Sequence, residues 1–295
     1  MISWKTRERI VRYLLMIFAF SSIIFLTGII IVLFKEGLPI FQKVGIFEFI
    51  FGKIWDPTYT PPDYGIFPLL TASLLVTAGA MLFAVPIGIA SAIFISSILP
   101  AKLKNIVKPV VELLAGIPSV IYGLFGMRIL GPFIRDLFSL PTGLIALTAS
   151  IMLGIMALPT IISLAEDAIA AVPLSYRDAS LALGGTRWET ISRSILPAAS
   201  SGILTAIILG ISRAIGETMT VLMVAGGAPM VAKSFLIPVR PMTANIAAEM
   251  GETAVGSTHY HALFGIGIIL FLMTLVFNII ADMAANRFRK KVAGE

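Results

Sequence analysis

The chain has 295 residues, of which 58% are hydrophobic and only 13% charged, against about 25% charged residues in a soluble domain, so lipid is its expected solvent. Its formal net charge is +6, but the basic residues are dispersed between apolar segments rather than gathered on one soluble face, which argues against nucleic-acid binding. The absence of cysteine excludes disulfide frameworks, thiolate catalysis and cysteine-ligated zinc.

The first two apolar stretches predict two transmembrane helices. Hydrocarbon about 30 Å thick requires roughly 20 helical residues. Residues 13–34 are uncharged and follow several basic residues. This run is too long for a signal-peptide core and no small-x-small cleavage pattern follows it, so we expect a retained first helix. The second helix is expected at about 69–98, with Pro86 inside it as a site for a kink.

The remaining stretches predict four more helices. The third, at about 109–134, contains Pro118 and three glycines, which predict a broken or closely packed helix that protein or a water-filled cavity must cover. The others are expected within 137–165, near 200–226 and near 262–284. The predicted fold class is therefore all-α, a polytopic membrane protein of about six transmembrane helices.

The distribution of basic residues predicts the orientation, because cytoplasmic segments are enriched in Lys and Arg. With the N-terminus inside, fourteen of the 22 basic residues fall in inner segments and six in outer segments. We therefore expect both termini in the cytoplasm of a prokaryote, with the chain in its cytoplasmic (inner) membrane.

Residues 166–197 form a loop far more polar than its flanks. Its apolar spacing predicts two short helices, joined at Gly184 and Gly185, with the second ending at Pro197. From the residues alone, a membrane-surface amphipathic hairpin that merely connects two spans is an equal alternative to a docking element.

The same loop resembles the EAA loop of ABC-importer permeases, whose pattern is E-A-A, three residues, G, and a final L-P. Asp178 replaces the usual Glu, Ser180 replaces the second Ala, and Ser194 stands where a branched apolar residue is usual. In that family the loop seats in a groove of the ATPase subunit, which implies a coupling interface at six matching positions: Asp178, Ala179, Ser180, Gly184, Leu196 and Pro197.

Four further segments resemble the PstC-type permease subunit of phosphate importers: ELLAGIPSVIYGLFG from Glu112, SRAIGETMTVLMVAGGAP from Ser212, MTANIAAEMGE from Met242 and HYHALF from His259. The sister PstA-type subunit shares the loop but not the TANIAAEMGE stretch. The resemblance implies the type I ABC importer permease architecture. It divides the chain into a first helix with its external loop (1–68), a permease domain (69–284) and a basic cytoplasmic tail (285–295).

The resemblance also implies partners. These are a second, PstA-type permease, a pair of PstB-type ATPase subunits that use ATP and Mg²⁺, and an external PstS-type phosphate-binding protein. The chain itself contains no G-x-x-x-x-G-K-[ST] phosphate loop. It is therefore expected to be no enzyme, to carry no cofactor or metal, and to contact membrane lipid.

Charges inside the apolar runs predict the substrate path. Arg213 and Glu217 are four residues apart, which would place them on one face of the fifth helix, and each is costly in lipid unless it faces protein or water. We expect them to pair and, with Thr218, to contact phosphate. The alternative is a structural ion pair that never touches substrate. Arg128 is expected to reach the interface.

Polar residues nearer the helix ends are expected to have roles other than substrate contact. Glu112 is expected to pair with Lys108 near an inner helix end. His259 and His261 lack further ligands at metal-binding spacing. Glu249 and Glu252 are expected on a lid helix that docks an external partner.

Two other function classes remain as alternatives. A self-sufficient ion-coupled transporter usually contains internal repeats, and we find none in the sequence. An ABC permease for a different oxyanion would share the loop motif. The intramembrane-enzyme class has no support, because the spans contain neither a serine-histidine nor a paired-aspartate constellation.

Overall fold

A computed structural model describes residues 4–293 of the chain as a helical bundle with one small hairpin. The long helices are α1 (Trp4–Val44), α3 (Phe67–Ile93), α7 (Ala146–Ala170), α10 (Leu196–Ile215) and α13 (Thr258–Ala293). The short helices are α2 (Ile46–Phe51), α4 (Ala101–Ala115), α5 (Ser119–Phe125), α6 (Gly131–Leu137), α8 (Leu174–Ala182), α9 (Arg187–Thr190), α11 (Met219–Val224) and α12 (Met242–Glu249). Three π-helical turns are η1 (Phe94–Ile98), η2 (Gly126–Leu130) and η3 (Ile191–Ile195), and the hairpin strands are β1 (Trp55–Asp56) and β2 (Asp63–Tyr64).

The centre of the bundle is the packing of α7 against α3 on one side and α10 on the other. Small residues allow this close approach, as they do between membrane helices generally. Ala72, Val76 and Ala80 of α3 pack with Ala149 and Leu153 of α7. The backbones are close enough that a Cβ added at Gly154 would lie 3.1 Å from the carbonyl oxygen of Ala80.

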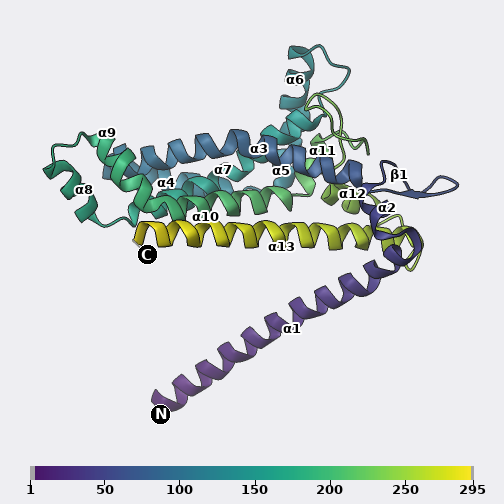
Figure 1. Cartoon of the computed structure of the whole chain (residues 1–295), viewed down its shortest axis with the longest axis horizontal. Helices are drawn as coiled ribbons and strands as arrows, with labels where there is room; N and C mark the ends of the chain where they lie inside the picture. Colours follow the sequence, from purple (N-terminus) through teal and green to yellow (C-terminus); the bar gives the residue numbers. More distant parts are fainter. Residues whose placement is uncertain (1–3, 294–295) are drawn as a thin grey trace.

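The two ends of the bundle differ. In Figure 1, α8 and α9 project at one end, where both ends of the chain also lie, whereas α2, β1, α6 and α12 gather at the opposite end. The charge distribution predicts that the first end is the inner one, and we name the two ends inner and outer on that expectation. The predicted basic tail, 285–295, is helical as far as Ala293, while its side chains lie outside the described part.

Helix α1 leaves the bundle at an angle and approaches it only near the outer end, where it packs on α13 (Figure 1). None of the residues in its most apolar window is buried by the rest of the chain. This apolar surface therefore faces lipid or another protein.

Five helices are long and apolar enough to cross a membrane, and a sixth crossing is completed only if α4 and the segment 119–137 count as one span. These two parts are bent by 87° across residues 116–118. The predicted break in the third helix is confirmed, but its predicted start at 109 is wrong, since α4 begins at Ala101. The first and last helices also extend beyond their predicted bounds, because polar ends continue a helix into the interface.

The predicted start of the inner loop at 166 is also wrong, because α7 continues to Ala170. The first polar residues after the apolar run, Glu166 and Asp167, stay helical because lysines of α4 pair with them. Pro197 does not end the second short helix as predicted. It lies in the first turn of α10, where a missing N–H costs little, and η3 leads into α10 without a gap.

The outer end is organised around one carboxylate, that of Glu249, which is only 17% exposed. It accepts hydrogen bonds from Trp55 Nε1 at 3.0 Å and from Arg240 at 2.7 Å, and it contacts His259 Nε2 at 2.8 Å. The Asn245 side-chain amide donates a longer bond of 3.4 Å. This side chain ties the hairpin, α12 and α13 together. Glu249 is the last residue of α12, whereas Glu252 lies beyond the end of that helix, and docking of an external partner by this segment stays a prediction.

Glu249→Gln is expected to lower the free energy of unfolding by about 2 kcal/mol, because it leaves the Arg240 guanidinium largely buried without its counter-charge. The measurement is the midpoint of heat-induced unfolding in detergent, beside the control Glu252→Gln. Glu252 has an exposed side chain in the same segment and should leave the midpoint unchanged. Equal midpoints for the two variants would contradict the role assigned to Glu249.

Candidate functional site

The fifth predicted helix is interrupted where its charges lie. Helix α10 ends at Ile215 and α11 begins at Met219, so residues 216–218 are not helical. The Glu217 carboxylate accepts the backbone N–H of Thr220 at 3.2 Å, and the Glu217 carbonyl accepts the Thr243 hydroxyl at 2.7 Å. The prediction of one continuous helix over 200–226 is therefore wrong, because Glu217 bonds to the backbone of the next segment and to α12.

Arg213 and Glu217 consequently do not share a helical face, and the predicted ion pair is absent. No carboxylate among the described residues lies within 4.0 Å of the Arg213 guanidinium, and its buried Nε has no hydrogen-bond partner there. Thr218 is half-buried in the break, and its hydroxyl donates only a long bond of 3.4 Å to the Gly216 carbonyl. The Arg213 guanidinium therefore has N–H groups that can donate hydrogen bonds to an anion.

A second break faces the first. Residues 116–118 separate α4 from α5, and the Tyr122 hydroxyl spans this bend by donating to the Leu114 carbonyl at 2.9 Å. The Thr220 hydroxyl of α11 donates to the Ser119 carbonyl of α5 at 3.0 Å, which joins the two broken segments directly. The sequence indicated the α4–α5 break through its glycines and Pro118, but no pattern in the sequence indicated that Thr220 and Ser119 would meet.

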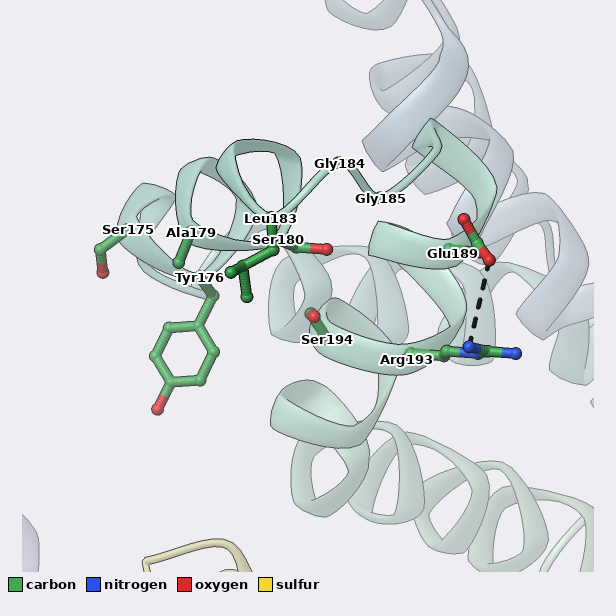
Figure 2. A pocket seen from close by; sticks show the side chains of 10 residues that line it. All are labelled: Ser175, Tyr176, Ala179, Ser180, Leu183, Gly184, Gly185, Glu189, Arg193 and Ser194. Carbon is green, nitrogen blue, oxygen red and sulfur yellow. Dashed lines mark ion pairs between the residues drawn. The ribbon is translucent and has the colours of Figure 1, made fainter.

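The inner loop forms an open groove between two helical segments. Its volume is about 680 Å³, and α8 forms one wall while α9 and η3 form the other (Figure 2). Residues 184 and 185 join the walls, and Gly184 has φ +84°, a left-handed conformation that favours glycine. In Figure 2, Ala179 and Ser180 lie across the groove from Ser194 and from the Glu189–Arg193 pair, whose closest atoms are 4.0 Å apart.

The structure brings three of the six predicted coupling residues into this groove: Ala179, Ser180 and Gly184. Asp178 is exposed on α8 but does not line the groove. Leu196 and Pro197 lie in the first turn of α10, beyond the groove. The predicted pair of short helices joined at the glycines is confirmed.

The second wall of the groove has a rigid start. Thr186 and Glu189 form a capping box, in which the Thr186 hydroxyl accepts the Glu189 N–H at 3.2 Å and the Glu189 carboxylate accepts the Thr186 N–H at 3.0 Å. Such reciprocal bonds fix the first turn of a helix. The groove therefore has a defined shape in the unbound chain.

Large apolar side chains of the loop are uncovered. Leu183 is 90% exposed, Leu174 is 73% exposed and Trp188 is 61% exposed. Their spacing predicted apolar faces on the two short helices, yet no part of the described chain covers these three residues. Exposed apolar residues in and beside a concave site are typical of protein-docking surfaces.

Comparisons with known proteins agree with this geometry. Residues 84–294 match the family described as binding-protein-dependent transport system inner membrane component. "Probable ABC transporter permease protein YqgH" of Bacillus subtilis is 40% identical over 88% of this chain and 85% of its own length. "Phosphate transport system permease protein PstC" of Mesorhizobium japonicum is 34% identical over 89% of this chain and 85% of its own length.

A solved structure of similar fold is a chain of a bacterial alginate ABC transporter, crystallised in complex with an alginate pentasaccharide-bound periplasmic protein. The match has a TM-score of 0.67 and covers 96% of each chain at 16% sequence identity. At this identity the likeness concerns the fold, which is that of a type I ABC importer permease.

Proposed function

Because this chain belongs to the family of binding-protein-dependent transport system inner membrane components, we propose that it is a permease subunit of an ATP-driven phosphate importer. Relatives that are 34% and 31% identical over most of the chain are phosphate transport system permeases by name. The alginate transporter supports the architecture only, since its similarity is in fold.

The observation that carries the proposal is Arg213, an arginine within the membrane bundle that has no acidic partner in the described chain. Phosphate at neutral pH is a mono- or dianion, and the planar guanidinium fork matches two of its oxygens. Glu217 and Thr218, in the adjoining break, complete the proposed path. The Glu217 carboxylate accepts the Thr220 N–H, which holds its negative charge in the break, where it would limit how tightly an anion is held.

The chain would work as one part of a larger assembly. The ATPase pair binds the groove formed by α8, α9 and η3 and uses ATP and Mg²⁺, a PstA-type permease forms the other half of the path, and a PstS-type binding protein delivers phosphate. The membrane is the cytoplasmic membrane of a prokaryote, with both termini on its cytoplasmic side, as the excess of inner basic residues favours. The uncovered apolar surface of α1 supports a partner within the membrane.

Coupling requires the assembly to alternate between outward-open and inward-open states. ATP binding would move the loop through Asp178, Ala179, Ser180 and Gly184, and η3 passes directly into α10, which carries Arg213. A shift of α10 relative to the two breaks would change which side of the membrane reaches the arginine.

The test is reconstitution of the complete complex in vesicles. The expected result is phosphate uptake that requires ATP, both permeases and the binding protein, and none with this chain alone. Uptake by the isolated chain would establish the ion-coupled transporter instead. Stimulation of ATP hydrolysis by another oxyanion but not by phosphate would establish a different substrate.

A further inference from the structure

A row of charged and polar side chains joins α4 to the inner end of α7. The α4 members are spaced four residues apart, which places them on one face of that helix. The α7 members lie within its last two turns. We call this set the α4–α7 ladder: Lys104, Lys108 and Glu112 on α4, with Ser163, Glu166 and Asp167 on α7.

The centre of the ladder is the Glu166 carboxylate, which is 1% exposed. Lys104 Nζ lies 2.5 Å from its Oε1, an ion-pair contact whose geometry is not that of a hydrogen bond. Lys108 Nζ donates to the other oxygen, Oε2, at 2.7 Å and also to Asp167. The Ser163 hydroxyl donates to Glu112 at 3.3 Å. The predicted pairing of Glu112 with Lys108 is therefore wrong, because the closer and more buried Glu166 holds the lysine.

Burial makes this link stiff. A carboxylate removed from water is stable only while its counter-charges stay in place, and removing one partner of a buried pair leaves an uncompensated charge. Sliding α4 along α7 would separate two lysines from Glu166 at once. The inner end of α7 and the helix α4 must therefore move together.

The ladder lies between the two parts of the site. Glu166 and Asp167 are followed at once by the end of α7 and then by α8, one wall of the groove. The other end of α4 is the break at 116–118, whose far side is held to α11 by the bond from Thr220 to Ser119. A second connection thus runs from the groove to the substrate path, separate from the one through η3 and α10.

We propose that the α4–α7 ladder transmits movement of the inner loop to the α4–α5 break, so that Lys104, Lys108 and Glu166 are positioning residues for translocation. The inference rests on the proposed function. The ladder touches neither ATP nor phosphate, and its loss should separate ATP hydrolysis from transport rather than stop both.

The test measures phosphate taken up per ATP hydrolysed in vesicles that contain equal amounts of the complete complex. Lys104→Gln is expected to keep ATP hydrolysis within about twofold of the unmodified complex while uptake per ATP falls about tenfold. Lys104→Arg, which preserves the charge, should restore most of the ratio. The matched control is Lys102→Gln, since Lys102 is an exposed lysine of the same helix without an ion pair in the described chain, and it should leave the ratio unchanged.

Two further variants keep the test decisive. Asp167 is 57% exposed, so Asp167→Asn should assemble normally and lower the ratio about threefold. Lys104→Gln combined with Glu166→Gln should lose no more than the worse single variant, because residues that act as one unit are not additive.

The proposal is overturned if Lys104→Gln and Asp167→Asn both leave the ratio unchanged, or if each reduces uptake and hydrolysis in equal proportion. The unmodified complex separates this failure from failure of the proposed function. If that complex does not couple ATP to phosphate uptake, the function is wrong whatever the variants do.

Discussion

Arg213→Gln is expected to reduce ATP-driven phosphate uptake at least about 100-fold in a fully assembled complex, a loss of about 2.7 kcal/mol. Glutamine is similar in length but has no charge and cannot present the two parallel donors that a phosphate oxygen pair accepts. No acid in the described chain pairs with Arg213, so its removal leaves no orphaned carboxylate and should preserve the fold. The measurement is initial uptake of labelled phosphate into vesicles.

Two further variants show whether the loss of uptake comes from removing the planar guanidinium or only from removing a positive charge. Arg213→Lys keeps a point charge and should retain an intermediate rate. Arg128→Gln removes an exposed arginine from another apolar span and should change uptake by less than twofold. If Arg213→Gln transports at the unmodified rate in a correctly assembled complex, Arg213 has a structural role only.

Leu183→Asp is expected to weaken binding of the ATPase to the permease pair about 30-fold, because an apolar anchor at the edge of a docking groove would become a charge that must be desolvated. Leu183 is 90% exposed, so the substitution removes no packing within this chain. The measurement is the Kd of the ATPase for the permease pair in detergent, followed by uptake in vesicles.

The control for this variant is Val255→Asp. Val255 is 85% exposed and lies in the loop just before α13, at the outer end of the bundle. The Val255→Asp substitution adds the same charge at a similarly exposed apolar position. Because this position is at the opposite end of the bundle from the groove, the affinity for the ATPase should not change. An equal effect of both substitutions would mean that added negative charge, rather than lost docking, weakens the complex.

Much of the fold could be predicted because hydrocarbon thickness sets the length of the apolar runs, and polar loop residues separate one run from the next. The two short helices of the inner loop followed from spacing and from Gly184 and Gly185. The residues at which helices begin and end were harder to predict. Residues Glu166 and Asp167 look like loop residues in sequence, and the lysines that pair with them in the helix lie some 60 positions earlier.

The sequence predicted which residues form the candidate path better than it predicted how they are arranged. Arg213 was recognisable because a charge is costly in lipid. Its separation from Glu217 was not, because spacing assumes a continuous helix and the break at 216–218 depends on Thr243, which is far away in the sequence. The contacts of Glu249 could not be predicted either, since Trp55 lies 194 positions away and the bonds from Arg240, Asn245 and His259 depend on how the outer segment folds.

The lysines of α4 also constrain the order of membrane insertion. During synthesis α4 emerges before α7, and until Glu166 follows, its two lysines lack the carboxylate that pairs with them in the folded chain. An amphipathic helix of 15 residues is stable at the lipid–water boundary instead. Helix α4 should therefore rest at the membrane surface until α7 supplies the carboxylate, so the third crossing is completed only after the fourth has inserted.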